Sequence, residues 1–480
     1  MASVIIQYSK YIILVLFLLY VFGAYFALGY EKHPKIQKRI CLVQKIFLYA
    51  IHAMGFLCLY LKESSMEIVI FYLMQVGLFS VIFVLFQLIH KHCSVLLLNN
   101  MCMLLAIGMI ILTRISIEKA FRQFVFIAIG TFAMLIIPFL FKKGTFFRNL
   151  SILYFLAGVA LLAVVVVIGA TSYGAKLTIS IGGFSFQPSE FVKIIFVFFI
   201  ASLLYKGADF KRVVITSCFS AVYVLLLVAS KDLGGALLYF MAFLLMIYVA
   251  SKKIIYLGIG TVGFLAAGAT GYYLFSHVRT RVFVWLNPTA DIDNQGYQIC
   301  QSLLGIAKGG WFGFGIGEGV PKKIPVVEKD FIFSAISEEF GAIFAMAIIL
   351  LCLCLFLHII RISLQVKDKF YKLVAVGLSV LYATQVVLTI GGAIKFIPST
   401  GVTLPLVSYG GSSMLSTMII LGIVQGLNMR RVASHSDAKN KNAVEYYVVA
   451  CIFIAIFIAM IAYLTYFLGV KSEEFIMLFP

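Results

Sequence analysis

The 480-residue chain has little charge and, in particular, few acidic residues. Charged residues make up 12% of it and hydrophobic residues 63%, and the mean hydropathy is +1.07. A soluble globular chain is about half apolar and about a quarter charged, so this composition excludes a soluble fold. We expect an all-α polytopic membrane protein, because a helix satisfies its own backbone polar groups in lipid.

Long apolar runs recur along the whole chain, and a membrane helix needs about 20 such residues. The first run lacks the short apolar core and the cleavage site of a signal peptide, so we expect it to be retained. The sequence predicts about fourteen membrane helices, near residues 11–29, 45–61, 68–89, 96–114, 121–141, 150–170, 188–205, 213–229, 235–250, 254–276, 332–360, 373–391, 412–429 and 445–469.

Basic residues exceed acidic residues on one set of loops only. These loops hold 22 Lys and Arg and 5 Asp and Glu, whereas the rest of the chain holds 16 and 14, so the net charges are +17 and +2. The positive-inside rule places these loops in the cytoplasm, and both termini and the loop 278–331 outside. Since topology explains the basic balance, we expect no nucleic-acid partner. The set comprises the loops near residues 30–45, 90–95, 142–149, 206–212, 251–253, 361–372 and 430–445.

The nine cysteines form no CxxC pair, and the sequence has no His/Cys cluster with the spacing of a metal site. Most cysteines fall inside predicted spans, and Cys352 and Cys354 point to different faces of one helix. We interpret them as small apolar residues of a membrane core and expect neither a zinc site nor a disulfide framework.

Prolines are few, and six of the nine fall in three predicted outer loops, 171–190, 278–331 and 392–411. Proline and glycine mark the places where a chain leaves regular structure. We expect these loops to gather on one outer face and to define one site.

Ionisable residues stand at two helix entrances beside these loops. Pro188 begins a predicted helix, and Glu190 and Lys193 share one face of it because they are three residues apart. Lys231 and Asp232 stand at the outer end of another span. Two interpretations remain open for each pair: a local ion pair, or side chains that line a polar cavity.

The long outer loop ends at Asp330, directly before the predicted span 332–360. Asp330 has the residue type and position of a helix N-cap, but a carboxylate at the boundary between water and membrane also suits a general base. Glu338 and Glu339 lie about two turns further and require partners, for which Lys193 is the candidate. In the third loop, the Gly410–Ser413 segment opens a helix, which is either an anion site or a common helix entry.

Four segments occur in one order: QPSEFVK (187–193), GYQICQSLLGIAKGGWFGFGIG (296–317), DFIFSAISEEFG (330–341) and IPSTGVTLPLVSYGGSS (397–413). Together they resemble the motifs of the SEDS family (RodA, FtsW and SpoVE). The resemblance covers about residues 95–431 and implies a ten-helix core. Three extra helices over 1–94 precede this core, and 432–480 adds a cytoplasmic linker and one extra helix. The pattern departs before Asp330, where the family has Pro-Glu-x-His-Thr and this chain has Pro325 followed by Val-Val-Glu-Lys.

The resemblance implies a peptidoglycan glycosyltransferase of the bacterial cell membrane. It would polymerise lipid II outside the membrane, release undecaprenyl diphosphate, and form a complex with a class B penicillin-binding protein. Asp330 would be the catalytic residue. We expect no firmly held metal, although carboxylates can hold Mg²⁺ or Mn²⁺ loosely beside a diphosphate. The residues predicted to contact substrate are Glu190, Lys193, Lys231, Asp232, Arg281, Gln298, Ser302, Glu338, Glu339, Ser408, Gly410, Ser412 and Ser413.

Two other function classes are compatible with such a chain. A flippase for lipid-linked precursors needs ionisable groups along a path through the bilayer, whereas the charged groups here gather near the outer ends of spans. An inactive scaffold for the transpeptidase would not need Asp330. Both alternatives are weaker than the glycosyltransferase.

Overall fold

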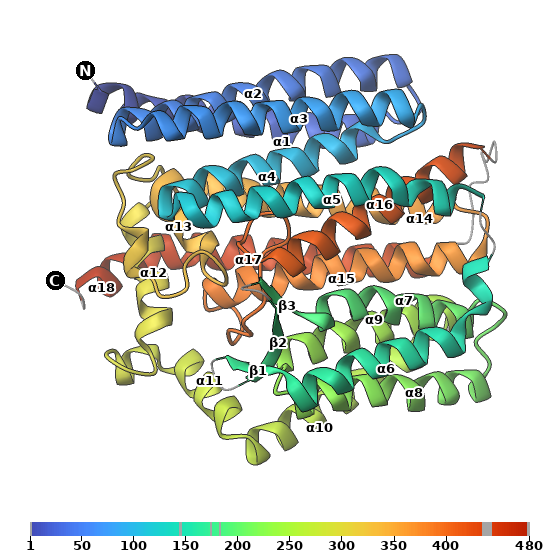
Figure 1. The fold of residues 1–480 in the computed structure, drawn as a ribbon. Helices are drawn as coiled ribbons and strands as arrows, with labels where there is room; N and C mark the ends of the chain where they lie inside the picture. The colour runs from blue at the N-terminus through green and yellow to red at the C-terminus, as the bar shows by residue number, and fades with distance from the viewer. Residues whose placement is uncertain (1, 144–145, 173–174, 182–183, 434–443, 478–480) are drawn as a thin grey trace.

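The computed structural model describes residues 2–143, 146–172, 175–181, 184–433 and 444–477, which are almost entirely helical (Figure 1). Its long helices lie side by side and roughly parallel. Helix α1 begins and helix α18 ends at the same end of the bundle, which also carries α11 and α12. The helices are α1 (Ala2–Gly29), α2 (Pro34–Glu63), α3 (Met66–Ile89), α4 (Val95–Ile115), α5 (Ile117–Lys143), α6 (Ser151–Ile168), α7 (Pro188–Leu204), α8 (Phe210–Ala229), α9 (Leu233–Ser251), α10 (Ile255–Leu274), α11 (Ser276–Leu286), α12 (Tyr297–Gly309), α13 (Ile332–Phe340), α14 (Ala342–Gln365), α15 (Lys369–Ala393), α16 (Gly411–Ala433), α17 (Val444–Tyr466) and α18 (Ser472–Met477).

Three short 3₁₀ helices, one π-helical turn and one small sheet complete the described part of the fold. The turns are η1 (Phe146–Asn149), η2 (Pro288–Asp291), η3 (Pro321–Lys323) and η4 (Phe467–Lys471), and the strands are β1 (Ala170–Ser172), β2 (Ala175–Ile181) and β3 (Phe184–Phe186). The strands pair antiparallel in the order β1-β2-β3. The all-helical prediction did not include this sheet, which occupies the first of the three predicted outer loops.

The prediction of a multi-helix membrane protein is confirmed. Among the described residues, thirteen helices are long and apolar enough to cross a membrane. The fourteenth predicted span is α7, whose 17 residues extend about 25 Å at 1.5 Å per residue.

The span predicted near 332–360 corresponds to α14, but its predicted start is wrong because the helix is broken at Gly341, which separates α13 from α14. Gly341 has φ +89°, and a Cβ there would lie 2.5 Å from Trp311 O and Gly313 N. The outer loop crosses at this point, since the first N–H groups of α14 donate to Gly310 O and Trp311 O at 3.0 and 3.3 Å. A side chain at position 341 would displace the loop segment that crosses the chain there.

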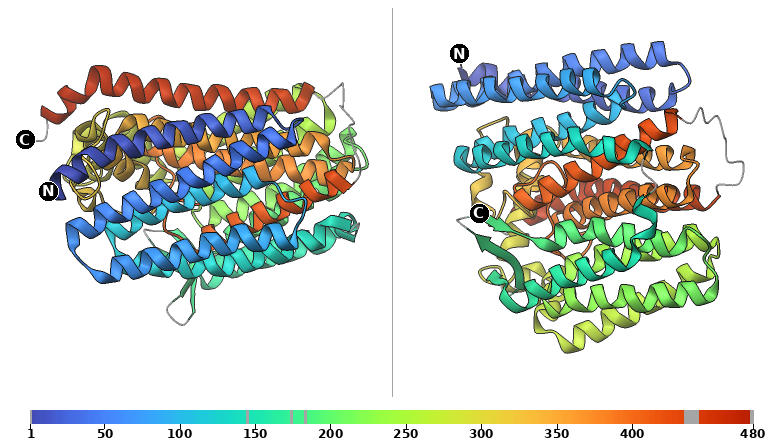
Figure 2. Two further views of the ribbon diagram at one scale, coloured as in Figure 1. Left: turned by 90° about the horizontal axis from the view of Figure 1, so that it is seen from above. Right: turned by 45° about the vertical axis from the view of Figure 1, so that its right-hand side comes forward.

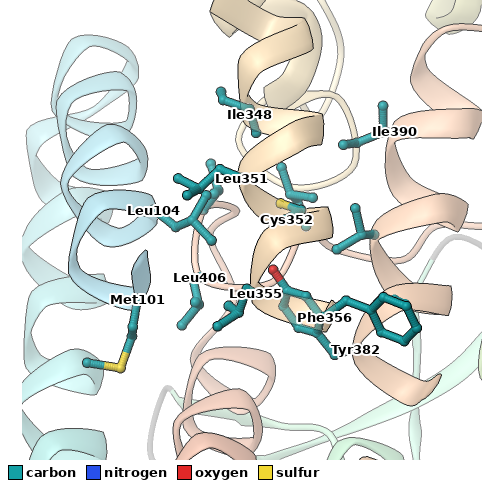
Figure 3. Close-up of a cluster of buried hydrophobic side chains, with 14 of the residues drawn as sticks. Met101, Leu104, Ile348, Leu351, Cys352, Leu355, Phe356, Tyr382, Ile390 and Leu406 are labelled. Carbon is teal, nitrogen blue, oxygen red and sulfur yellow. The ribbon is translucent and has the colours of Figure 1, made fainter. Parts of the chain in front are cut away.

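The core of the bundle is mainly apolar. Side chains of α14, among them Leu351, Cys352 and Leu355, pack between Leu104 of α4 and Tyr382 of α15 (Figure 3). All nine cysteines are free, and seven of them are at least partly buried. This agrees with the interpretation of the cysteines as core residues.

The three extra helices α1–α3 lie together along one side of the bundle (Figure 2). Polar contacts fasten them to the core at both ends. On the side of the long outer loop, Lys10 Nζ donates to Gly313 O at 2.8 Å, and Lys62 pairs with Glu318 at 2.9 Å. At the opposite end, Glu31 pairs with Arg361 at 2.6 Å and also with an arginine of α16.

Candidate active site

The three predicted outer loops meet around one cavity of about 760 Å³. Its lining comes from the sheet and the start of α7, from the turn before α9, from the segment between α11 and α13, and from the segment that joins α15 to α16. The prediction that these loops gather at one place is therefore confirmed. The cavity lies at the end of the bundle that carries the long loop.

Asp330 lines this cavity just before α13. The N-cap interpretation is wrong, because α13 begins one residue later, with Phe331 in the cap position and no side-chain cap bond. Among the described residues, the Asp330 carboxylate has no hydrogen-bond or ion-pair partner. Burial raises its pKa to about 6, although the positive charges of Lys329 and Arg281 act in the opposite direction.

Arg281 of α11 reaches the same part of the cavity. Its Nη1 donates to Ser399 O at 3.0 Å. A Cβ placed on Gly401, whose φ is +75°, would lie 3.7 Å from Asp330 Oδ2 and 3.9 Å from Arg281 Nη2. Gly401 therefore keeps the space between this carboxylate and this guanidinium open.

Glu190 and Lys193 form the ion pair that their spacing predicted, and both also line the cavity. Lys193 Nζ lies 2.5 Å from Glu190 Oε2 and donates to Gln385 Oε1 at 2.9 Å. Ser416 Oγ donates to the same glutamate at 2.9 Å. The positive charge of Lys193 is thus neutralised within the protein.

Lys231 and Asp232 do not pair with each other. Asp232 is the N-cap of α9, since its side chain accepts from Gly235 N at 2.8 Å, and it accepts from Ser189 Oγ at 3.2 Å. Burial raises the pKa of Asp232, against the effect of these two hydrogen bonds. Lys231 is exposed at the rim of the cavity, in a left-handed turn with φ +61°.

Glu338 and Glu339 do not line the cavity, and their expected partner Lys193 is wrong. Glu339 Oε1 accepts from Arg114 Nε of α4 at 3.0 Å, and Glu338 Oε1 accepts from Val320 N at 2.8 Å. The same arginine donates to two carbonyls of the long loop. The two glutamates therefore hold the loop against the C-terminal end of α13.

Two predicted contact residues also lie outside the cavity lining. Ser302 is fully buried and bonds to Ser334 at 2.6 Å and to Ala393 O at 2.9 Å. Ser408 accepts from Leu404 N at 2.9 Å and donates to Lys329 O at 2.5 Å. Both hydroxyls are committed to holding the protein together.

The remaining predicted contacts do line the cavity: Gln298, Gly410, Ser412 and Ser413. Gly410 N already donates to Gln123 at 3.2 Å, and Ser412 Oγ accepts from Gln187 N at 3.0 Å. Ser413 Oγ accepts from Thr403 Oγ1 at 2.8 Å. The start of α16 is thus tied into the cavity wall by hydrogen bonds.

Several cavity residues were not predicted, among them Lys329, Thr400 and Lys395. The Thr400 hydroxyl is inaccessible to solvent and has no partner among the described residues. Lys329 had a signal in the sequence, because it precedes Asp330 and replaces a residue of the family pattern. Thr400 and Lys395 had none beyond their place in the third loop.

The cavity does not offer a metal site of protein ligands alone. The described part of the chain contains no group of three or more His, Cys, Asp or Glu residues that could hold a metal ion. A divalent ion would need phosphate oxygens of the substrate as further ligands, so we derive no step through a metal.

Comparison with known proteins places the chain in a family. The family model of the FtsW, RodA and SpoVE cell cycle proteins matches residues 91–433. The chain belongs to this family. The peptidoglycan glycosyltransferase RodA of Mycobacterium tuberculosis is 34% identical over 362 residues, which cover 68% of this chain and 76% of that protein. The stage V sporulation protein E of Bacillus subtilis is 33% identical, over 65% of this chain and 87% of that protein.

Two solved structures share the fold. A chain from a peptidoglycan synthase complex that coordinates polymerization and crosslinking is 26% identical, with a TM-score of 0.60, and the match covers 71% of this chain and 98% of that chain. RodA of Thermus thermophilus matches with a TM-score of 0.52 and 24% identity, over 71% of this chain and 97% of that chain. The division of this chain at residues 94 and 432 stays a prediction.

Proposed function

We propose that this protein is a peptidoglycan glycosyltransferase that polymerises lipid II at the outer face of the bacterial cytoplasmic membrane. The observation that carries the proposal is Asp330. Its carboxylate lines the cavity and has no partner among the described residues, and burial raises its pKa to about 6. A base with a pKa near the working pH suits general base catalysis. The names of the curated relatives support the same activity.

The cavity supplies the groups that glycosyl transfer needs. A sugar hydroxyl of one lipid-linked saccharide attacks the anomeric carbon of another, and the Asp330 carboxylate accepts its proton. The bond from the anomeric carbon to the diphosphate breaks, and undecaprenyl diphosphate leaves with the electron pair. Arg281 is placed to stabilise this charge, because its guanidinium and the Asp330 carboxylate both lie within 4 Å of a Cβ built on Gly401.

The position of the cavity favours an enzyme over a flippase. A flippase needs polar groups along a path through the bilayer. Here the lining residues come from the outer loops and the adjoining helix ends, and a cluster of apolar side chains packs between α4, α14 and α15 (Figure 3). Chemistry at one membrane face fits this arrangement.

A class B penicillin-binding protein is the proposed partner. Support comes from the solved relative in a complex that coordinates polymerization and crosslinking, since crosslinking requires a transpeptidase.

Reconstitution tests the function directly. Purified protein in liposomes, supplied with lipid II, should make glycan polymer, and addition of a class B penicillin-binding protein should raise the yield. Translocation of lipid II without polymer would identify a flippase instead. Polymer formed only by an added enzyme, and never by this protein, would identify a scaffold.

The proposed orientation has its own test. Lys322 in the long loop and Lys369 at the start of α15 are both exposed, and single cysteines there, in a background without native cysteines, report opposite sides. An impermeant thiol reagent applied to intact cells should label position 322 only. Labelling of position 369 alone would invert the topology and remove Asp330 from the outer face.

A further inference from the structure

Four basic side chains of the cavity have no ion-pair partner among the described residues. Arg122 and Lys193 also line the cavity, but each is paired with a glutamate. Arg281 and Lys395 each donate one hydrogen bond to a backbone carbonyl, at 3.0 and 3.5 Å. The cavity therefore has an excess of positive charge. The four are Lys231, Arg281, Lys329 and Lys395.

Lys329 stands out because its backbone is held on both sides. Its N–H donates to Val326 O at 3.0 Å, and its carbonyl accepts from Ser408 Oγ at 2.5 Å. Val326 has φ +53°, so the chain makes a sharp left-handed turn there. The side chains of Lys329 and Asp330 are thus presented to the cavity from a firmly held segment.

The acid next to Lys329 does not neutralise it. Glu328 Oε1 lies 2.5 Å from Lys119 Nζ of α5, and Tyr409 N donates to Glu328 O at 2.7 Å. Burial alone would raise the pKa of Glu328, but the hydrogen bond and charge of Lys119, with a smaller effect from the charge of Lys329, hold it below its usual value. Lys119, and not Lys329, makes the ion pair with Glu328. Neither Glu328 nor Lys119 lines the cavity, so the positive charge of Lys329 remains available to a ligand.

The charge of Lys329 also affects the pKa of Asp330. Burial raises the pKa of Asp330, and the charge of Lys329, together with that of Arg281, reduces this increase. An ammonium group that affects this carboxylate lies near the reacting atoms.

We propose that Lys329 binds the diphosphate of the lipid-linked glycosyl donor, together with Arg281, and stabilises the negative charge on the leaving diphosphate. This inference rests on the proposed function. In the step, a bond forms from the acceptor oxygen to the anomeric carbon, and the bond from that carbon to the phosphate oxygen breaks. The electron pair goes to the diphosphate and the acceptor proton goes to Asp330. An ammonium is a compact point charge that suits a phosphate.

Three variants of the full chain test this role in lipid II polymerisation. Lys329→Met should lower kcat on the order of 10²-fold, the loss expected for one preorganised charge-stabilising group, with a smaller effect on KM. Lys329→Arg keeps the charge and should stay within about tenfold of the parent. Lys323→Met is the matched control, because Lys323 is an exposed lysine of the same loop outside the cavity lining. Lys329→Met should also move the acidic limb of the rate profile to higher pH.

A binding measurement separates this inference from the proposed function. Undecaprenyl diphosphate should raise the Tm of the parent protein and of Lys323→Met, and should raise that of Lys329→Met much less. Undecaprenyl monophosphate should stabilise all three weakly. A parent that polymerises while Lys329→Met matches Lys323→Met in kcat and in Tm response overturns the role of Lys329 alone. An inactive parent overturns the proposed function, and the Tm response then still decides whether Lys329 binds diphosphate.

Discussion

The two ends of the short helix α13 carry acidic residues with opposite surroundings. At the C-terminal end, Glu338 and Glu339 are held by Val320 N and Arg114. At the N-terminal end, Asp330 lines the cavity and has no partner among the described residues. Burial of an unpaired acid costs free energy. Glu338 and Glu339 each have a protein partner, although Glu339 Oε2 has none among the described residues, whereas the whole Asp330 carboxylate is left for a ligand. The contrast separates acids that hold the loop in place from the acid that we propose acts in catalysis.

Breaking the ion pair of Arg114 and Glu339 should give the largest loss of stability. Glu339→Gln and Arg114→Met should each lower the free energy of unfolding by about 3–5 kcal/mol, because each leaves a buried partner unpaired. The double variant should recover part of the loss. Thermal unfolding in detergent measures all three.

The exposed pair of Lys62 and Glu318 is the control for this cycle. Its side chains are 43% and 40% exposed, so Lys62→Met should cost at most about 1 kcal/mol. Equal losses for Lys62→Met and Glu339→Gln would mean that Arg114 and Glu339 do not form a structural joint.

The carboxylate of Asp330 should determine the pH dependence of activity. Asp330 must be unprotonated to accept a proton, and its pKa is raised to about 6. The rate should therefore be level above about pH 7 and should fall about tenfold per pH unit well below 6. Initial rates of polymerisation between pH 4.5 and 8 measure this acidic limb of the pH–rate profile. A rate that is level down to pH 4.5 would show that no group with this pKa is needed.

Gly401→Ala should give a smaller, local effect. The residue has φ +75°, so alanine costs about 1–2 kcal/mol there, and the methyl group enters the space between Asp330 and Arg281. We expect kcat to fall by about tenfold, the equivalent of about 1.4 kcal/mol. Gly258→Ala in α10 is the control, since a Cβ there meets nothing within 4 Å. Equal activity of the two variants would show that substrate does not use this space.

The local features of this molecule could be predicted from the sequence. Hydropathy locates the spans, because each span satisfies its own backbone in lipid. Three-residue spacing predicts the pair of Glu190 and Lys193. The loops that hold most prolines line the cavity together, and Asp330 lies where water meets the bundle.

The long-range features could not be predicted in the same way. Arg114 and Glu339 are 225 residues apart, and nothing local in the sequence couples them. Gly341 looks like an ordinary helix residue until the loop that crosses it is known. Ser302 and Ser408 resemble binding residues by type, but their hydroxyls are taken by partners from other elements. Side-chain function here depends on which groups are already satisfied.

Asp330→Asn in the lipid II polymerisation assay, with Tm recorded on the same sample, tests the central claim most directly. Asparagine keeps the shape and removes the ability to accept a proton, so the rate should fall by about 10²–10⁴. The variant should be at least as stable as the parent at pH 7. The reason is that burial raises the pKa of Asp330, so ionisation of the carboxyl destabilises the folded protein as pH rises from about the unfolded value toward 6. A folded Asp330→Asn protein that polymerises lipid II at the parent rate would contradict the account.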